Sequence, residues 1–286
     1  MHLTAKKSLG QHFLVVPAFH KRIVEALAPT SDDVVIEIGP GTGLLTRVLL
    51  ESPLKQLIAF ELDARAVPEL QAMFRSEGKR FELQEQDFLE MDLKAIAERV
   101  GQTLKVAGNI PYYITSPILF KLIDERKFVK QAVLLVQKEV AERLVARPRT
   151  KEYGIPTVFA NFFGEVSYLF TVPAGAFRPV PKVDSAVVRI AFDRDYFTRT
   201  GTPPPPSYDE AAFRKLVRSL FAMRRKTIRN NLKAMLSAEA MKPVEGGPAL
   251  HFLTQRAEEL AIPDFLEILR AIDLRANGFI SGDGSR

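Results

Sequence analysis

The sequence has no cysteine and only four histidines among its 286 residues. Without cysteine, the chain cannot form disulfides, thiolate metal sites or a cysteine nucleophile. The histidines are scattered and lack the spacing of metal ligands, so no zinc or iron site is expected. No apolar run is long enough to span a bilayer, and the first residues lack the hydrophobic segment of a signal peptide. We therefore expect a soluble, cytoplasmic protein.

Acidic side chains are fewer than basic ones, which leaves a formal charge of +6. A basic excess favours a polyanionic partner, although a small excess is also common in proteins that bind no polyanion. The position of the charge along the chain is therefore more informative than its sum. The length is sufficient for two domains, the larger of which can bury a sizeable core.

Short β-rich runs recur between residues 33 and 192, and most gaps between them carry apolar residues at helical spacing. Alternating strands and helices favour an α/β fold with a doubly wound, mainly parallel sheet. Such sheets bind ligands at the carboxyl ends of their strands, where the strand order reverses. The seven predicted strands are residues 34–38, 57–60, 81–84, 104–107, 132–136, 168–172 and 186–192.

Four consecutive prolines at residues 203–206 mark a domain boundary, because they cannot join a helix or a central strand and favour an extended linker. Ser207 to Glu210 have capping-box spacing, and residues 210–237 are predicted to form two helices or one bent helix. Residues 263–272 are predicted to form the last helix. The predicted parts are a first domain at 1–197, a linker at 198–207, a small helical domain at 208–275 and a disordered tail at 276–286.

Three glycines at alternate positions, Gly39, Gly41 and Gly43, follow the first predicted strand in the sequence EIGPGTG. They allow a tight turn in which a ligand can lie directly on the backbone, which is typical of nucleotide binding. The spacing differs from the dinucleotide pattern G-x-G-x-x-G, because Leu44 stands where that pattern has its last glycine. NAD is therefore disfavoured, and a turn without any ligand remains an alternative.

Acidic residues follow the next two predicted strands. Glu61 comes one βα unit after the glycines, at a position suited to hydrogen bonds with ribose hydroxyls. Asp87 could accept a hydrogen bond from the exocyclic amine of adenine, and Phe88 could pack near the ring. Either acid alone could equally be a solvated residue after a strand. Together with the glycine turn they favour a ligand that has adenine and ribose but no pyrophosphate, namely S-adenosylmethionine.

The fourth predicted strand leads into the sequence NIPYY, which begins at Asn109. The exocyclic amine of adenine is a poor nucleophile because its lone pair is delocalised into the ring. The Asn109 side-chain oxygen and a backbone carbonyl held by Pro111 could bind both amine hydrogens and turn the lone pair toward a sulfonium methyl. Catalysis would then rest on positioning and electrostatics. Tyr112 would supply an aromatic face for the extruded base, although an Asn/Pro turn with buried tyrosines remains an alternative.

In these motifs and several others, the chain resembles the KsgA/RsmA family of ribosomal RNA adenine N6,N6-dimethyltransferases. The resemblance implies a Rossmann-like methyltransferase domain and a small helical C-terminal domain. It also implies transfer of methyl groups from S-adenosylmethionine, which becomes S-adenosylhomocysteine, to two adjacent adenosines in the hairpin loop near the 3′ end of small-subunit rRNA. The matching blocks are KKSLGQHFL at 6–14, EIGPGTG at 37–43, NIPYYITSP at 109–117, QKEVAERL at 137–144, FRPVPKVDS at 177–185 and RRKTIRN at 224–230.

The resemblance further assigns roles to individual residues. Phe177 would complete an aromatic clamp on the flipped base, with ordinary core packing as the alternative. Tyr113 stands where many relatives carry asparagine. The implied cofactor residues are Gln11, His12 and Leu14 beside the methionine part, Gly39 and Gly41 in the turn, Glu61 at the ribose, Asp87 and Phe88 at the adenine, and Asn109, which with Pro111 and Tyr112 would orient the target amine.

Positive charge is concentrated in residues 214–233, which contain eight basic residues and no acidic one. A solvated helix face usually mixes both signs, so this segment favours contacts with phosphates. A second patch near residues 143–151 is explained almost as well by a plain surface loop. The predicted RNA-binding residues are Arg143, Arg147, Arg218, Arg224, Arg225, Lys226 and Arg229. The expected partner is small-subunit rRNA within an immature 30S-type particle, bound by a monomer without a metal or a membrane.

Other functions remain open on this sequence. A large-subunit rRNA adenine N6-methyltransferase of the antibiotic-resistance type would share the chemistry of the NIPY motif. A non-catalytic ribosome-assembly factor could keep the same fold, although the intact glycine turn, Glu61 and NIPY motif disfavour lost catalysis. An NAD-dependent oxidoreductase is disfavoured by the glycine spacing. Cysteine-dependent methylation of cytosine is excluded by composition.

Overall fold

The structure is a computed structural model that describes residue 6, residues 10–205 and residues 208–272. By their contacts, the described residues fall into two units. The first contains the residues up to Val145 and Phe163–Asp195, and the second contains Ala146–Phe162 and the residues from Tyr196 onward. This grouping assigns residues 146–162 to the C-terminal unit, whereas the sequence pattern placed the boundary only at 197. The predicted tail lies outside the described residues, and within them no helix is long and apolar enough to cross a membrane.

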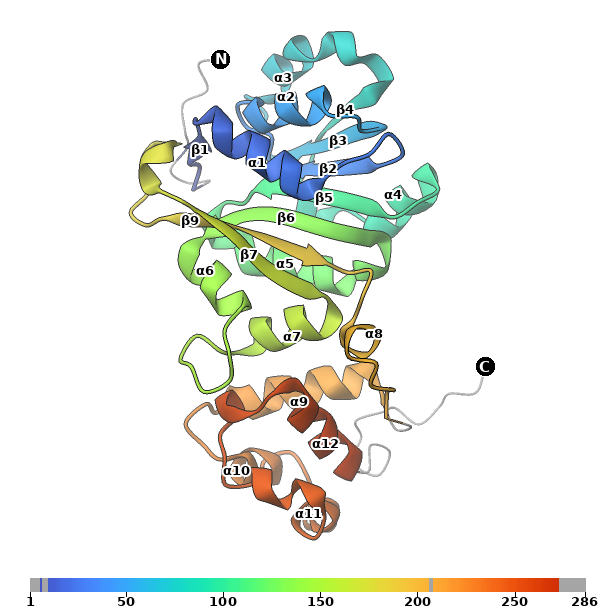
Figure 1. Ribbon diagram of the computed structural model, residues 1–286, viewed down its shortest axis with the longest axis vertical. Helices are drawn as coiled ribbons and strands as arrows, with labels where there is room; N and C mark the ends of the chain where they lie inside the picture. Colours follow the sequence, from blue (N-terminus) through green and yellow to red (C-terminus); the bar gives the residue numbers. More distant parts are fainter. Residues whose placement is uncertain (1–5, 7–9, 206–207, 273–286) are drawn as a thin grey trace. The chain divides into compact units, whose positions relative to one another are not determined.

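The first unit is built on a seven-stranded sheet with the order β4-β3-β2-β5-β6-β9-β7 (Figure 1). The strands from β4 to β6 run parallel, whereas β9 is antiparallel to both of its neighbours. The predicted α/β class and doubly wound, mainly parallel sheet are therefore confirmed. The strands are β2 (Val34–Ile38), β3 (Gln56–Glu61), β4 (Phe81–Glu85), β5 (Leu104–Asn109), β6 (Val129–Gln137), β7 (Glu165–Val172) and β9 (Ser185–Ala191).

Helices cover both faces of this sheet because the chain winds away from β2 in two directions. α2 (Leu44–Glu51) and α3 (Val67–Met73) carry the chain to β3 and then to the β4 edge. α4 (Leu93–Val100) and α5 (Thr115–Asp124) carry it back toward β5 and β6 and therefore lie on the other face, since parallel crossovers are right-handed. α1 (Pro17–Leu27) packs beside α2. The strand order reverses between β2 and β5, which is where such sheets bind ligands.

The central strands are buried on both faces, as expected of a parallel sheet. On one face, Val35 and Leu57 belong to a core cluster that also contains Leu49 of α2. On the other face, their neighbours Ile36 and Ile58 are also fully buried. Most polar side chains of this region are therefore confined to the ends of the strands.

A second sheet in the first unit has two strands that the sequence pattern did not predict. β1 (Phe13–Leu14) pairs antiparallel with β8 (Phe177–Arg178). The Val15 amide extends this contact by donating to the Ala176 carbonyl. Strands of this length are too short to give an alternating pattern. They hold the N-terminal segment against the part of the chain that precedes β9, next to which α6 (Lys138–Leu144) also packs.

The described part of the second unit is helical (Figure 1). Residues 210–237 contain two separate helices, α9 (Glu210–Ala222) and α10 (Ile228–Lys233). The predicted capping box at Ser207, a residue outside the described ranges, is wrong: Asp209 caps α9 by accepting a hydrogen bond from the Ala212 amide. The last helix is confirmed, with a small shift in its bounds. The other helices are α7 (Ile155–Phe163), which ends in the first unit, α8 (Tyr196–Thr200), α11 (Ala238–Glu245) and α12 (Ile262–Ala271).

Candidate functional site

A cavity lies in the first unit where β2, β3, β4 and β5 end, at the predicted point of reversal. The N-terminal segment that precedes β1 forms another of its walls. The parallel sheet and this segment thus bring together residues from Gly10 to Ile114, which are 104 positions apart in the chain. The lining residues are Gly10, Gln11, His12, Phe13, Ile38, Gly39, Gly41, Phe60, Glu61, Leu62, Gln86, Asp87, Phe88, Asn109, Ile110, Pro111, Tyr112, Tyr113 and Ile114.

The three alternate glycines turn the chain from β2 into α2 in the left-handed region, with φ of 65° at Gly39, 53° at Gly41 and 75° at Gly43. A Cβ atom at Gly39 would meet nothing within 4 Å, so its backbone is open to the cavity. A Cβ atom at Gly41 would lie 2.9 Å from the ring of Phe13. The turn therefore requires glycine for two reasons, its backbone angles and the close approach of the N-terminal segment.

The carboxylate of Glu61 is fixed at the end of β3. One oxygen accepts a hydrogen bond from the Gly41 amide at 2.8 Å, and the other accepts one from the Asp63 amide at 2.8 Å. Burial raises the pKa of this carboxyl, and the two amides partly oppose that effect. Each oxygen keeps a further acceptor position, so the group can still bind a pair of hydroxyls.

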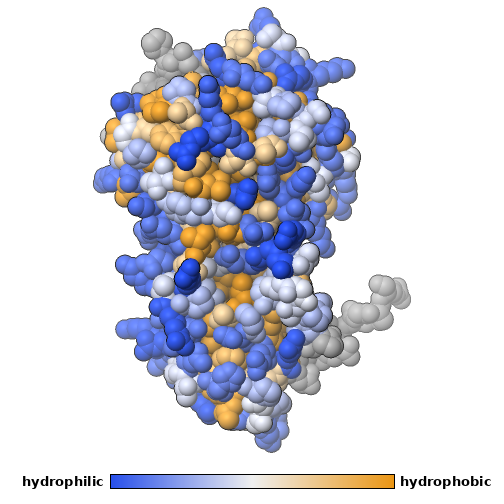
Figure 2. Space-filling model, in the orientation of Figure 1, coloured by the Kyte–Doolittle hydropathy of each residue, from blue (hydrophilic) through white to orange (hydrophobic). Residues whose placement is uncertain are grey.

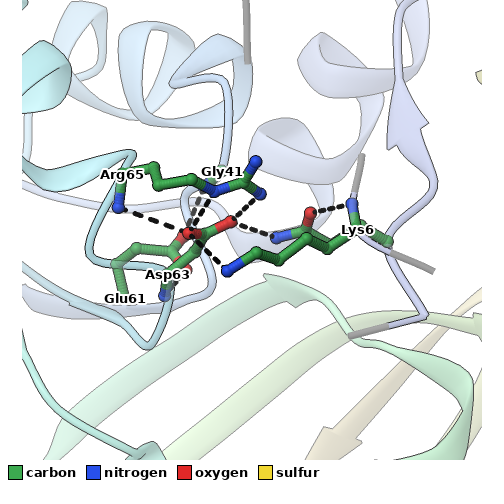
Figure 3. Close-up of polar contacts among 6 residues, drawn as sticks. Lys6, Gly41, Glu61, Asp63 and Arg65 are labelled. Atoms are coloured by element: carbon green, nitrogen blue, oxygen red, sulfur yellow. Dashed lines mark hydrogen bonds and ion pairs between the residues drawn. The ribbon is translucent and has the colours of Figure 1, made fainter. Parts of the chain in front are cut away.

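Asp63 lies beside Glu61 and ties the N-terminal segment to β3 (Figure 3). Arg65 donates to both of its oxygens, at 2.9 Å from Nε and 2.6 Å from Nη2. This guanidinium lowers the pKa of the Asp63 carboxyl to about 2. Gln11 Nε2 donates to the same carboxylate at 3.2 Å, while Gln11 Oε1 accepts from the Lys6 amide. Asp63 is therefore ionised, and its side chain is 1% exposed.

The predicted adenine residues lie at the end of β4. Asp87 Oδ1 accepts a hydrogen bond from the Leu89 amide at 2.9 Å, which leaves its other oxygen to a ligand. Phe88 is buried and packs edge-on against Phe60, with 6.2 Å between the ring centroids. An acidic acceptor and an apolar wall are thus adjacent in one part of the cavity.

The amide of Asn109 has a defined orientation at the end of β5. Its Nδ2 donates to the backbone carbonyl of His12 at 2.8 Å. A carbonyl can only accept, so the NH₂ group must face His12, and Oδ1 is the atom available to another donor. The loop that follows contains Pro111 and Tyr112, which also line the cavity.

Tyr112 is held on two sides. Its hydroxyl is 2.8 Å from the Oγ of Ser185, a fully buried residue at the start of β9, and burial raises the pKa of this hydroxyl. Its ring stacks on the ring of His12, with centroids 5.6 Å apart and an interplanar angle of 24°. The His12 ring is also hydrogen-bonded through Nδ1 to the carbonyl of Pro179 at 2.8 Å. The hydroxyl is therefore used for support, and the ring lines the cavity.

A smaller cavity adjoins the first and shares Phe13, Gly39 and Asn109 with it. Glu37 lines it, and burial raises the pKa of this carboxyl to about 8. Glu37 Oε2 has no hydrogen-bond partner among the residues that the structure describes. Leu14, which the resemblance assigned to the cofactor, lines this smaller cavity and not the larger one.

Phe177 is the predicted catalytic residue that the structure does not bring to either cavity. Its ring is fully buried in the core cluster of the first unit. β8 pairs it with Leu14 of β1. In this position Phe177 packs in the core and supports the N-terminal segment through the pairing of β8 with β1.

The predicted RNA-binding residues differ in their surroundings. Arg224 is paired with Glu258 and also donates to the carbonyls of Lys151 and Tyr153. Arg229 is paired with Glu245 at 2.6 Å. Their acidic partners lie outside the acid-free segment, which is why the sequence pattern could not reveal them.

The surroundings of the remaining residues of this set also differ. Arg143 pairs with Glu139 one turn earlier in α6, and Arg218 lies 5.8 Å from the centroid of the Phe159 ring. Arg147, Arg225 and Lys226 are exposed. Figure 2 shows one face of each unit, on which hydrophilic side chains cover most of the surface and apolar ones appear in patches.

Sequence reasoning assigned no role to three residues that shape the site, Glu37, Asp63 and Ser185. Glu37 and Ser185 stand in quoted motifs and Asp63 does not. The importance of all three depends on burial, and Asp63 and Ser185 also have partners from elsewhere in the chain, Gln11 and Tyr112. Alternation along β3 is the only local signal for Asp63, since it lies two residues after Glu61. Within residues 6, 10–205 and 208–272, no group of three or more His, Asp or Glu side chains is placed to hold a metal ion.

Comparisons with known proteins agree with this arrangement. A family model described as ribosomal RNA adenine dimethylase matches residues 2–258. The chain is 40% identical to ribosomal RNA small subunit methyltransferase A of Chlorobaculum tepidum, over 98% of this chain and 94% of that protein. It is 42% identical to the protein of that name from Chlorobium luteolum, over 94% and 90%.

Solved structures give a similar result. A dimethyladenosine transferase from Plasmodium falciparum superimposes with a TM-score of 0.74 at 27% identity, over 90% of this chain and 96% of that one. The 23S rRNA methyltransferase ErmE superimposes with a TM-score of 0.65 at 25% identity, over 91% and 99%.

Proposed function

Because the chain belongs to the ribosomal RNA adenine dimethylase family, we propose that the larger cavity is the active site of a methyltransferase that dimethylates N6 of two adjacent adenosines in small-subunit rRNA. The observation that carries this proposal is the set of acceptors around one cavity. Glu61 suits ribose hydroxyls, Asp87 suits an adenine amine, and Oδ1 of Asn109 suits a second amine that arrives from outside.

Two features of the cavity walls fit S-adenosylmethionine. The open backbone at Gly39 offers a surface on which a ligand can lie without meeting a side chain. Oε2 of Glu37 is a buried polar atom without a hydrogen-bond partner among the described residues, beside the same turn. A buried polar atom of this kind is costly unless a ligand or water satisfies it.

When bound, S-adenosylmethionine supplies a methyl group on a positively charged sulfur. The chain's own residues then have holding and orienting roles. The proposed contacts are Gln11, His12 and Leu14 with the methionine part, Gly39 and Gly41 with the ligand through their backbone, Glu61 with the ribose, and Asp87, Phe88 and Asn109 with the remainder.

Asn109 would orient the target amine. Its Oδ1 accepts one hydrogen of the adenine N6 amine, and a backbone carbonyl beside Pro111 accepts the other. Both bonds favour the geometry in which the nitrogen lone pair points toward the methyl group. No strong base is needed for the attack, so the rate gain comes from positioning and electrostatics.

Tyr112 would provide the face on which the extruded adenine stacks, since its ring lines the cavity while its hydroxyl is bound to Ser185. A direct contact between Phe177 and the base would require β8 to leave the core. Phe177 would therefore take part in the proposed aromatic clamp only in a state in which β8 has moved out of the core. In the position described here, it supports β1.

The proposed partner is an immature small-subunit particle, which a monomer of this protein meets in the cytoplasm. In this proposal the helical domain at residues 208–275 binds the RNA. Arg143, Arg147, Arg218, Arg224, Arg225, Lys226 and Arg229 would contact phosphates, and Arg147, Arg225 and Lys226 are exposed. The small-subunit substrate is favoured over the large-subunit one because the relatives of about 40% identity carry the small-subunit name.

Mapping of transferred methyl groups tests this function. Small-subunit and large-subunit particles that lack the modification are each incubated with the protein and isotope-labelled S-adenosylmethionine, and the rRNA is analysed by mass spectrometry. We expect dimethyladenosine at two adjacent residues of the small-subunit hairpin loop. Labelling of large-subunit rRNA alone would support the resistance-type alternative, and tight binding without labelling would indicate an assembly factor.

A further inference from the structure

The N-terminal segment Gly10–Leu14 lies between two walls of the cavity. A Cβ atom at Gly10 would come within 3.1 Å of the Tyr113 ring, on the β5 side. The Phe13 ring lies against Gly41, on the β2 side. The segment therefore lies close to the glycine turn and to the loop that follows Asn109.

Two adjacent residues of this segment make its polar contacts with the cavity walls. The side chain of Gln11 is bound by Asp63, and the backbone carbonyl of His12 is bound by the amide of Asn109. Because Gln11 and His12 are neighbours, the bond that anchors the Gln11 side chain also restrains the backbone from which the His12 carbonyl projects. The orientation of the Asn109 amide therefore depends on where Gln11 is held.

Asp63, which binds Gln11, is a buried residue in this series of contacts from Asp63 to Asn109. Its side chain is 1% exposed, whereas the side chains of Arg65 and Lys6 around it are 42% and 48% exposed. Figure 3 shows the Asp63 carboxylate between Arg65 and the N-terminal segment. Asp63 does not line the cavity, so it cannot contact a ligand there directly.

We propose that Asp63 is a positioning residue, which holds Gln11 and through it places the His12 carbonyl that orients the amide of Asn109. This inference rests on the proposed function for the catalytic role of Asn109. The bidentate bond from Arg65 fixes the carboxylate, and the remaining acceptor capacity of Oδ2 fixes Gln11. When this bond is absent, the segment loses one of its attachments near the end of β3, and the His12 carbonyl is held less firmly at the NH₂ group of Asn109.

Three variants separate positioning from general stability. Asp63→Leu removes every acceptor at similar volume, and Asp63→Asn keeps an acceptor oxygen for Gln11. Arg65→Ala removes the exposed partner but keeps the carboxylate. Amide hydrogen exchange in β2 and β5 serves as an internal control for folding, since these strands do not contact the Asp63 side chain.

The first measurement is hydrogen exchange of residues 11–15 in the enzyme alone, with neither RNA nor cofactor. We expect exchange at least tenfold faster in Asp63→Leu than in wild type, near wild type in Asp63→Asn, and between the two in Arg65→Ala, which keeps the carboxylate but not the bonds that fix it. Unchanged exchange in Asp63→Leu would overturn the proposal. This result does not depend on any activity.

The second measurement separates binding from turnover. In Asp63→Leu we expect kcat to fall at least tenfold while the Kd for S-adenosylhomocysteine changes less than threefold, with most of kcat restored in Asp63→Asn. An effect on Kd alone, or an Asn variant as impaired as the Leu variant, would show that Asp63 supports only binding or folding. If wild type methylates no rRNA, the proposed function fails, whereas the exchange result still decides whether Asp63 holds the segment.

Discussion

The cavity of the first unit and the basic segment at residues 214–233 of the second unit differ in what fixes their properties. At the cavity, polar side chains are buried or half-buried and held by backbone groups: Glu61 accepts from the amides of Gly41 and Asp63, and Asn109 donates to the carbonyl of His12. In the basic segment, charged side chains are at the surface, and Arg224 and Arg229 are paired with acids from elsewhere in the chain. Chemistry at the cavity therefore depends on burial and fixed geometry, whereas binding by the basic segment depends on the charge that remains unpaired.

The buried carboxyl of Glu37 gives the largest expected effect at the cavity. Burial raises its pKa in the folded protein to about 8, from an ordinary value of 4.5. An acid whose pKa is raised by folding makes its full contribution to stability below its unfolded pKa, and this contribution is lost progressively as the pH rises through its folded pKa, about 8. In Glu37→Gln, the group cannot ionise, so this loss does not occur.

We therefore expect the unfolding free energy of Glu37→Gln, measured by urea denaturation, to increase relative to that of wild type as the pH rises. The gain should begin near pH 5 and approach about 4 kcal/mol at pH 8, since one pKa unit corresponds to about 1.4 kcal/mol. If the difference in unfolding free energy between the variant and wild type is constant from pH 5 to pH 8, Glu37 is not desolvated. Burial would then distinguish the cavity less clearly from the basic segment.

Gly39 tests whether the open backbone of the cavity is a ligand surface. Gly39→Val places a side chain where a ligand would lie, and we expect S-adenosylhomocysteine to bind at least a hundredfold more weakly by calorimetry. Gly101→Val is the matched control, because Gly101 also has a positive φ, of 73°, and open space around its Cβ position but lies at the end of α4. Both variants should lose similar stability. Equal affinities in the two variants would contradict the assignment of the cavity.

Arg225 and Lys226 test the charge of the basic segment. Both are exposed, and no ion pair of either is found in the part of the chain that the structure describes. Replacement of both by alanine should weaken rRNA binding about tenfold and reduce the slope of log K against log salt by about 2 units. Arg224→Ala, which removes an internal pair, should lower thermal stability with a smaller change in slope. A larger change in slope for Arg224→Ala than for the double variant would show that Arg224, and not Arg225 and Lys226, contacts phosphate.

Ser185→Ala should have the smallest effect. It removes the partner of the Tyr112 hydroxyl, and we expect a loss of about 1 kcal/mol in stability and a kcat a few-fold lower. Tyr112→Phe removes the same bond from the other side. The two changes should therefore be less than additive in the double variant. Additive effects would mean that this hydrogen bond does not hold the ring.

The sequence indicated the cavity because regular features of a parallel sheet determine where strands end. Glu61, Asp87 and Asn109 each follow a β-rich run, and the topology brings such positions together. The short pairing of β1 with β8 could not be predicted, since neither strand has a periodic pattern. It is also the reason that Phe177, placed at the base by resemblance, lies in the core.

The ion pairs of Arg224 and Arg229 could not be predicted from the sequence, for a different reason. Glu245 and Glu258 are distant from the acid-free segment along the chain, and only the folded second unit brings them to Arg229 and Arg224. Asp63 is a similar case, because its partner Gln11 precedes it by 52 residues. A local sequence pattern predicts which charged side chains a segment contains, whereas the residues that pair with them depend on the fold.

The most direct test of the central claim compares wild type with Asn109→Ala in a single turnover on small-subunit particles, with S-adenosylhomocysteine affinity measured alongside. The account predicts dimethyladenosine at two adjacent positions for wild type. For the variant it predicts a loss of at least a hundredfold in the rate of transfer, while affinity falls by less than tenfold. Transfer at the wild-type rate by Asn109→Ala would contradict the account, because the amide would then not orient the target amine.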